Sequence, residues 1–162
     1  MFRVGLLTCS DKGARGERQD TSAEEIRKLL PGGFQVEHYA VVPDEQAAIT
    51  ARLVDWCDRE RLDLIITAGG TGLTPRDVAP EATLAVLERE IPGLAEAMRA
   101  ASLAKTPHAM LSRGVAGIRG QTLIINLPGS PRAVRENLAV VLPALPHALE
   151  KIKGSPRECG SD

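Results

Sequence analysis

The clearest chemical signal in this chain is a glycine-rich segment followed by a cation and a carboxylate. Residues 69–72 read Gly-Gly-Thr-Gly, and Arg76 and Asp77 follow. Glycines let backbone N–H groups approach a ligand closely, and a strand-to-helix connection is where such groups converge on phosphate. A tight turn without a ligand is the alternative. Three glycines, two hydroxyls, Arg76 and Asp77 within residues 69–77 favour a phosphate or nucleotide site.

Two better-known phosphate-binding loops do not fit this segment. No lysine follows Gly72, as a Walker A loop requires. The third glycine of the dinucleotide-binding fingerprint is also missing from residues 70–74. The segment therefore predicts a nucleotide site of another kind.

Asp44 and Asp77 are the candidate metal ligands and catalytic acids. Each comes just after an apolar run that is typical of a buried strand. If both face one crevice, they could hold Mg²⁺ with its waters, which neutralises a triphosphate before attack. Asp44 alone could instead cap the helix that follows it. The pair favours a site.

Apolar strands that alternate with amphipathic helices must position these groups. The pattern predicts strands at residues 4–8, 34–42, 62–67 and 122–127, with a small irregular or hairpin excursion near 114–121. A capping box, Thr21 with Glu24, predicts the start of one helix. Pro143 and Pro146 predict a kink near Leu142 in the last helix. The expected fold is α/β: a single-domain, open, mostly parallel sheet with helices on both faces.

The carboxyl ends of parallel strands meet at one edge of such a sheet, where ligands bind. Those ends fall at residues 8–11, 42–44, 68–72 and 126–130. Ser10 and Asp11 in the first of them could also simply cap a turn. We expect the four ends to line one crevice.

Composition excludes several classes of function. Aromatic residues make up 2% of the chain and the net charge is -1, so neither stacking rings nor a basic groove for nucleic acid is evident. The three cysteines have no metal-ligand spacing and predict reduced thiols in the cytoplasm. We expect no membrane segment or leader. The histidines show no metal-binding or triad pattern, and we assign Cys9 no chemistry.

Seven segments in order resemble the molybdenum cofactor biosynthesis proteins of the MogA/MoaB family, and the G domains of gephyrin and of its plant counterpart. The segments are residues 7–11 (LTCSD), 42–45 (VPDE), 69–83 (GGTGLTPRDVAPEAT), 91–93 (IPG), 109–113 (AMLSR), 117–120 (GIRG) and 126–129 (NLPG). The resemblance implies a MogA/MoaB-like molybdopterin-binding domain over 1–153, and we expect a flexible tail over 154–162.

The resemblance also implies an activity, molybdopterin adenylyltransferase. With Mg²⁺, AMP passes from ATP to the terminal phosphate of molybdopterin, giving adenylyl-molybdopterin and pyrophosphate. It further implies a homotrimer and a MoeA-type enzyme that then inserts molybdate. Two alternatives stay open: a MoaB-like or scaffold-type molybdopterin-binding protein without this activity, and a nucleotide-binding protein with another ligand.

Matched positions give the expected site. The catalytic and metal-binding residues are Asp44 and Asp77; the nucleotide-binding residues are Gly69, Gly70, Thr71, Gly72, Ser112 and Arg113; the substrate-binding residues are Ser10, Asp11, Ser102, Asn126, Pro128 and Gly129.

Overall fold

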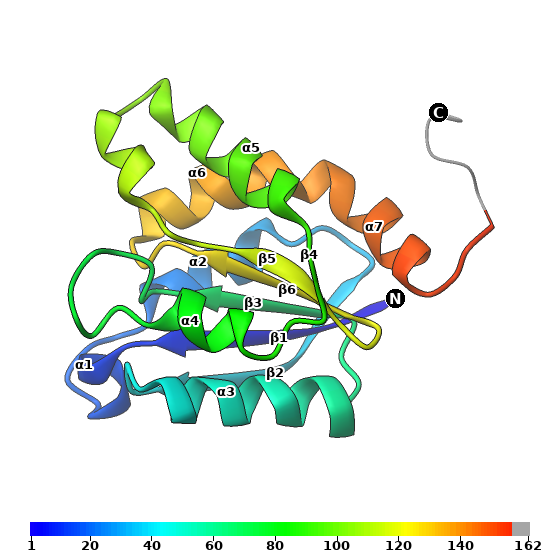
Figure 1. Cartoon of the computed structure of the whole chain (residues 1–162), viewed down its shortest axis with the longest axis horizontal. Coiled ribbons are helices and arrows are strands. Elements are labelled where there is room, and N and C mark those ends of the chain that lie inside the picture. The colour runs from blue at the N-terminus through cyan, green and yellow to red at the C-terminus, as the bar shows by residue number, and fades with distance from the viewer. Residues whose placement is uncertain (157–162) are drawn as a thin grey trace.

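Six strands form one sheet in the order β2-β1-β3-β6-β5-β4 in the computed structural model, which describes residues 1–156 (Figure 1). Four strands are parallel: β1 (Phe2–Cys9), β2 (Phe34–Val42), β3 (Leu64–Ala68) and β6 (Thr122–Leu127). Two antiparallel strands, β5 (Ala116–Arg119) and β4 (Arg89–Glu90), complete one edge. The central strands β3 and β6 are buried along their whole length, which explains their continuous apolar sequence.

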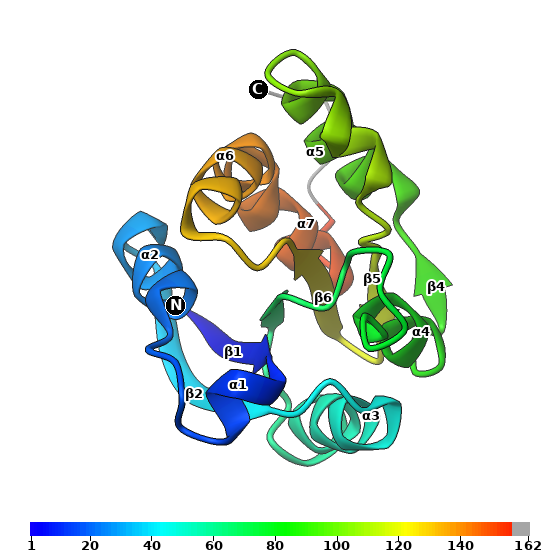
Figure 2. The ribbon, with the colours of Figure 1, turned by 90° about the vertical axis from the view of Figure 1, so that its left-hand side faces the viewer.

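Helices cover both faces of the sheet (Figure 2). One face carries α2 (Thr21–Leu29), α5 (Pro92–Leu103), α6 (Pro131–Val141) and α7 (Leu145–Ile152), and the other carries α1 (Asp11–Ala14), α3 (Gln46–Val54) and α4 (Ala79–Leu84). A π-helical turn (Asp55–Arg59) extends α3, and 3-10 turns lie at Pro107–Leu111 and Leu142–Ala144. Each layer of helices packs on its own apolar core, and alternate residues of a strand enter opposite cores, as Ile124 and Ile125 do.

The strand order reverses between β1 and β3. The chain passes from β1 outward to β2 on one side, and from β3 to β6 on the other. Thr8 pairs with Ala68, and Ala68 pairs with Leu127, so the carboxyl ends of these three strands lie level with one another. Such a reversal opens a crevice beyond the strand ends, because the two crossover connections leave in opposite directions.

The predicted α/β architecture is confirmed, including the hairpin, which β5 and β6 form. The predicted kink is also confirmed, since the 3-10 turn around Pro143 separates α6 from α7. The predicted capping box is wrong by one residue, because Asp20 caps α2 by accepting from Ala23 N at 3.0 Å. Strand β4 was not predicted. Of the expected tail, residues 157–162 lie outside the described part of the chain.

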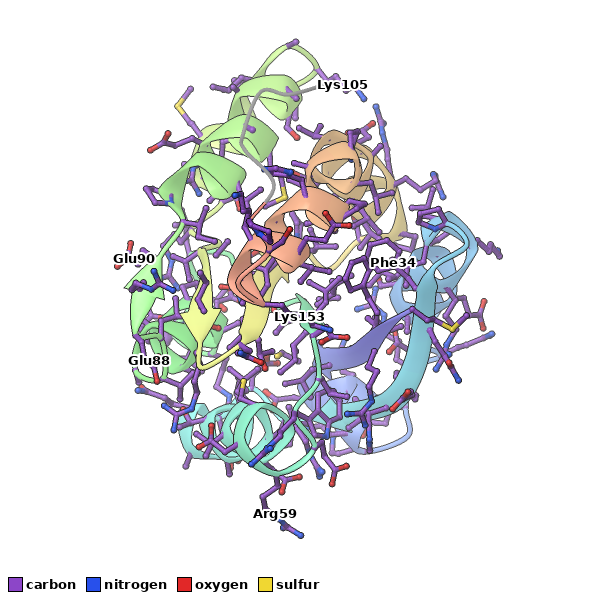
Figure 3. All side chains as sticks on the ribbon, turned by 90° about the vertical axis from the view of Figure 1, so that its right-hand side faces the viewer. Phe34, Arg59, Glu88, Glu90, Lys105 and Lys153 are labelled. Atoms are coloured by element: carbon purple, nitrogen blue, oxygen red, sulfur yellow. The ribbon has the colours of Figure 1, made fainter. Side chains whose placement is uncertain are left out.

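The amino-terminal edge of the sheet is held by the end of the last helix. Lys153 is labelled in Figure 3. Its Nζ lies 2.6 Å from Asp63 Oδ1 and 5.5 Å from the centre of the Phe2 ring. Asp63 Oδ2 in turn accepts from Arg3 N at 2.7 Å. Contacts of Lys153, after the last helix, therefore hold the amino-terminal ends of the strands, which lie opposite the crevice.

Candidate functional site

The glycine loop leaves β3 in a conformation that requires glycine. Gly69 has a φ of 94° and Gly70 a φ of 68°, which side chains disfavour. A Cβ at Gly69 would lie 2.5 Å from the carbonyl oxygen of Cys9, so the ends of β1 and β3 approach closely at this point. Within residues 1–156, the N–H groups of Gly70, Thr71 and Gly72 have no hydrogen-bond acceptor. These donors are free for an anionic ligand.

A polar cavity of about 470 Å³ lies beyond the strand ends and contains most of the predicted site. Its wall includes Asp44, Asp77, Ser10, Gly129 and the whole glycine loop. The carboxyl ends of β1 and β3 contribute to this wall, as do the segments that directly follow β2 and β6. The sequence prediction that Asp44 and Asp77 share one crevice with the glycine loop is thus matched by the geometry.

One carboxylate oxygen of Asp44 accepts a hydrogen bond from the backbone of Asp11, and the other has no hydrogen-bond partner in the described chain. Oδ2 accepts from Asp11 N at 3.0 Å, whereas Oδ1 is buried and has no hydrogen-bond partner in the described chain. Burial raises the pKa of Asp44, and the carboxylates of Asp11 and Asp77 raise it further. The alternative that Asp44 caps the next helix is wrong, because Glu45 occupies the cap position and no side chain bonds there. An unpartnered buried carboxylate oxygen in a cavity wall is typical of a site completed by a ligand.

Asp77 closes its own turn on the other side of the cavity. Oδ2 accepts from both Thr74 N at 2.9 Å and Thr74 Oγ1 at 2.7 Å. The second oxygen takes no hydrogen bond from residues 1–156. Asp77 therefore also offers one free carboxylate oxygen.

Ser10 and Asp11 prove to stabilise local structure. Ser10 Oγ accepts from Gly13 N at 3.0 Å and caps α1, as the turn-capping alternative predicted, although Ser10 also lines the polar cavity. Asp11 is not in the cavity wall. Its carboxylate binds Arg76, which holds the pKa of Asp11 below its usual value. Asp11 thus departs from the predicted substrate-binding role.

Arg113 braces the glycine loop from behind. Its backbone N donates to Thr71 O at 3.0 Å, its Nε donates to Gly72 O at 2.8 Å, and its two terminal nitrogens bind Asp77 O and the Glu81 carboxylate. Arg113 lines neither the polar cavity nor the smaller one beside it. Its structural position is that of a loop support and not of a direct nucleotide ligand.

Asn126 also departs from its predicted place. The side chain is 1% exposed; Oδ1 accepts from Val115 N, and Nδ2 donates to Thr67 Oγ1 and Thr83 Oγ1 at 2.9 Å. These bonds tie β6 to β3 and α4 beneath the cavity. We therefore assign Asn126 to the framework of the site.

A second cavity, of about 280 Å³, adjoins the first. Ser102, Ser112 and Pro128 line it, and Thr71 and Gly72 line both cavities. The remaining predicted residues thus gather in a separate chamber, with the glycine loop as the dividing wall.

Arg18 is a site residue that the sequence did not reveal. It is the one cationic side chain that residues 1–156 place in the wall of the larger cavity, and it has no hydrogen-bond or ion-pair partner in that part of the chain. It lies in a charged loop with no motif, so only the fold shows where it points.

Residues 1–156 contain no group of three or more His, Cys, Asp or Glu side chains arranged for a metal ion. Any metal held at Asp44 and Asp77 would therefore need ligands from water or substrate as well.

Within residues 1–156, no helix combines the length and apolar character needed to cross a membrane.

The reversed strand order, with the glycine loop and two carboxylates beside it, defines an α/β protein with a ligand site at a topological switch point. The chain belongs to the molybdenum cofactor biosynthesis family, since residues 5–147 match the family described as "Probable molybdopterin binding domain".

Relatives extend over nearly the whole chain. A molybdopterin adenylyltransferase of Helicobacter pylori (strain J99) is 42% identical over 160 residues, covering 95% of this chain and 89% of the relative. Gephyrin of Dictyostelium discoideum is 47% identical over 95% of this chain, which spans only 23% of gephyrin's length. The crystal structure of the molybdopterin biosynthesis enzyme MoaB of Thermus thermophilus is 62% identical, with a TM-score of 0.91, covering 98% of this chain and 100% of that one. The predicted family is confirmed.

Proposed function

We propose that this chain is a molybdopterin adenylyltransferase that uses Mg²⁺ to transfer AMP from ATP to the terminal phosphate of molybdopterin. The name of the Helicobacter pylori relative supports the reaction, because that likeness covers 95% of this chain. The switch-point cavity supports a nucleotide substrate, because it presents free backbone donors and two carboxylates together.

The observation that carries this proposal is the unpartnered Oδ1 of Asp44. A buried carboxylate oxygen without a hydrogen bond is costly unless a ligand completes it. Asp77 lines the same cavity and also has a free oxygen. Two carboxylates, with oxygens from phosphate and water, suit the hard, oxygen-preferring Mg²⁺ ion. Bound there, the ion would neutralise phosphate charge and make the α-phosphorus more electrophilic.

The chain's own residues would contribute by positioning. The free N–H groups of Gly70, Thr71 and Gly72 would bind phosphate oxygens, and Arg18 would add a cationic side chain from the same wall. The smaller cavity, with Ser102, Ser112 and Pro128, would hold the pterin. Because Thr71 and Gly72 line both cavities, the α-phosphate of ATP and the phosphate of molybdopterin would meet at the glycine loop.

The chemical step is a direct displacement. An oxygen of the molybdopterin phosphate attacks the α-phosphorus of ATP, the bond to the bridging β-phosphate oxygen breaks, and pyrophosphate leaves. The attacking oxygen is already ionised, so no side chain need act as a base. Alignment and charge neutralisation supply most of the catalysis in such transfers.

A second candidate is a molybdopterin-binding protein without transferase activity. It stays open because the 62% identical structure from Thermus thermophilus is named as a molybdopterin biosynthesis enzyme, MoaB, and not as an adenylyltransferase. The two candidates differ in one product, since only the transferase releases pyrophosphate.

The test is pyrophosphate release from ATP with purified molybdopterin and Mg²⁺. Asp77→Asn keeps an acceptor for Thr74 but loses the charge, so it should reduce release by at least about 100-fold, as loss of one group that stabilises transition-state charge does, and keep pterin affinity. Asp55→Asn, on the surface beside Arg59, is the matched control and should leave release unchanged. Release by Asp77→Asn at the wild-type rate would refute the metal assignment, and no release by the wild-type chain would favour the binding protein.

The resemblance to the family also implies a homotrimer and a MoeA-type partner, and the cysteine pattern predicts a cytoplasmic location; all three stay predictions. Sedimentation of the purified chain tests the trimer. Transfer of adenylyl-molybdopterin to a MoeA-type enzyme, measured as molybdate insertion, tests the partner.

A further inference from the structure

Arg76, the cation of the glycine loop, is bound to a carboxylate and not free for phosphate. Its Nε donates to Asp11 Oδ2 at 3.0 Å and its Nη2 donates to Asp11 Oδ1 at 2.8 Å. This bidentate ion pair joins the loop after β3 to the first residue of α1. Glu45 lies 3.8 Å from the same guanidinium. The geometry is the planar fork that arginine, and not lysine, forms with a carboxylate.

Asp11 is bound equally specifically to Asp44. The backbone N–H of Asp11 donates to Asp44 Oδ2, and the backbone N–H of Asp44 donates to Asp11 Oδ1, both at 3.0 Å. The two residues thus hold each other through reciprocal bonds between the ends of β1 and β2. A continuous set of hydrogen bonds runs from Arg76 through Asp11 to Asp44.

This set of bonds fixes which oxygen of Asp44 stays available. With Oδ2 bound to Asp11 N, Oδ1 lies over the glycine loop, 3.4 Å from the position of a Cβ on Gly70. Rotation of the carboxylate would break the bond at Oδ2. The unpartnered oxygen is therefore presented in one direction.

The same set of bonds places Asp77. Arg76 is its immediate neighbour, and the turn from Thr74 to Asp77 is closed by the bonds at Asp77 Oδ2. Anchoring Arg76 to Asp11 holds this turn against the end of β1. Both cavity carboxylates are thus held through Asp11: the Asp44 carboxylate by the Asp11 backbone N–H, and the Asp77 turn by the Asp11 side chain through Arg76.

We infer that Arg76 and Asp11 act together as positioning residues that set the separation and direction of the Asp44 and Asp77 carboxylates for a divalent cation. This inference rests on the function proposed above. It assigns Arg76 a role through Asp11 and not through contact with substrate. Such supporting partners commonly change metal affinity strongly while touching no metal themselves.

The experiment measures Mn²⁺ binding to the full chain by electron paramagnetic resonance, with α,β-methylene-ATP present. Arg76→Gln should weaken Mn²⁺ binding by roughly 10-fold or more, the range found for such supporting residues. Arg76→Lys should recover little, because an ammonium group cannot make the fork. Arg59→Gln, an 80% exposed arginine paired with Asp55, is the matched control and should bind Mn²⁺ as the wild type does.

Two further measurements separate positioning from mere folding. Thermal unfolding should shift little in Arg76→Gln, since the Arg76 side chain is 56% exposed and such pairs contribute little to stability. Asp11→Asn combined with Arg76→Gln should weaken Mn²⁺ binding no more than the more damaging single variant, because both changes break one unit.

Unchanged Mn²⁺ affinity in Arg76→Gln, or additive losses in the double variant, would overturn the inference while leaving the transferase proposal intact if the wild type still releases pyrophosphate. A wild-type chain that neither binds Mn²⁺ nor releases pyrophosphate would overturn both.

Discussion

Replacing Gly69 by alanine should destabilise the fold more than the same replacement at Gly33. Both glycines have similar backbone angles, with φ of 94° at Gly69 and 102° at Gly33. A new Cβ at Gly33 would meet nothing within 4 Å, whereas one at Gly69 would lie 2.5 Å from Cys9 O. The pair of variants therefore separates backbone strain from collision.

The expected loss of stability in each variant follows from the backbone strain and from the collision. An alanine at positive φ costs about 1–2 kcal/mol, and both variants carry that cost. Only the Gly69 variant must also move one backbone past another, which costs a further ~2 kcal/mol by comparison with overpacked cores. For a domain of this size, 2 kcal/mol corresponds to about 4–8 °C in the unfolding midpoint.

Urea and thermal unfolding, followed by circular dichroism, measure the difference. The Gly69 variant should also lose ATP binding, because the ends of β1 and β3 must separate to admit the methyl group. Equal losses of stability at Gly69 and Gly33, with ATP binding intact in both, would show that the close approach of the two strand ends has no energetic consequence.

Three other predictions concern single side chains. Arg18→Gln should weaken ATP binding by about 5- to 30-fold in a calorimetric titration, because a charge-assisted hydrogen bond contributes about 1.5–3 kcal/mol and part of it survives in glutamine. Asn126→Leu should lower the free energy of unfolding by about 2–4 kcal/mol in urea, since it leaves Val115 N and two buried hydroxyls without their partner. Cys9 and Cys57 should resist alkylation at pH 8, because burial raises their pKa to about 12 and about 11, so that few thiolates exist until the pH approaches those values.

The first and the third of these predictions have their own controls. Arg15→Gln alters a neighbouring arginine that pairs with Glu17 and lies outside the cavity wall, so equal loss of ATP affinity there would remove the special place of Arg18. Alkylation is followed by mass spectrometry in a Cys159→Ser background, and rapid labelling of the folded chain at pH 8 would contradict the assigned burial.

The raised pKa values of the two thiols also make the free energy of unfolding depend on pH. A group whose pKa is higher in the folded state stabilises that state while it stays protonated. The contribution of Cys9 and Cys57 is therefore fully present below pH 9.0, the ordinary value for cysteine, and is lost as the pH rises toward 11 and 12. Alanine at either position should flatten that part of the pH profile.

The sequence predicted the sheet and the edge that holds the site because both depend on local pattern. Uninterrupted apolar runs mark strands with two buried faces, and glycine or proline marks their ends. The partner of Arg76 could not be predicted, since Asp11 is 65 residues away and only the tertiary fold joins them. The bent final helix was predictable, because proline lacks the N–H that a continuous helix needs.

Asn126 shows why a polar residue at a strand end can mislead. It shares its side of β6 with Ile124, so strand alternation turns it inward toward α4, where Thr67 and Thr83 meet it. The sequence alone did not show whether the side chain of Asn126, near the end of β6, points into the core or into the crevice. The capping box failed for a similar reason, because Asp20 and Thr21 are both good caps and the preference between them depends on Asp20 also binding Thr8 and Tyr39.

The residues that line the larger cavity are spread along the chain between Thr8 and Ser130. During synthesis, β1 emerges first but lacks its inner neighbour until β3 follows, and the cavity is incomplete until β6 has joined the sheet. Since no shorter stretch of chain contains the site, only the complete sheet binds the ligand, and binding stabilises the sheet as a whole. Saturating ligand should therefore slow hydrogen exchange at β1, β3 and β6 alike, and a hundredfold excess over Kd should stabilise the entire domain by about 2.7 kcal/mol.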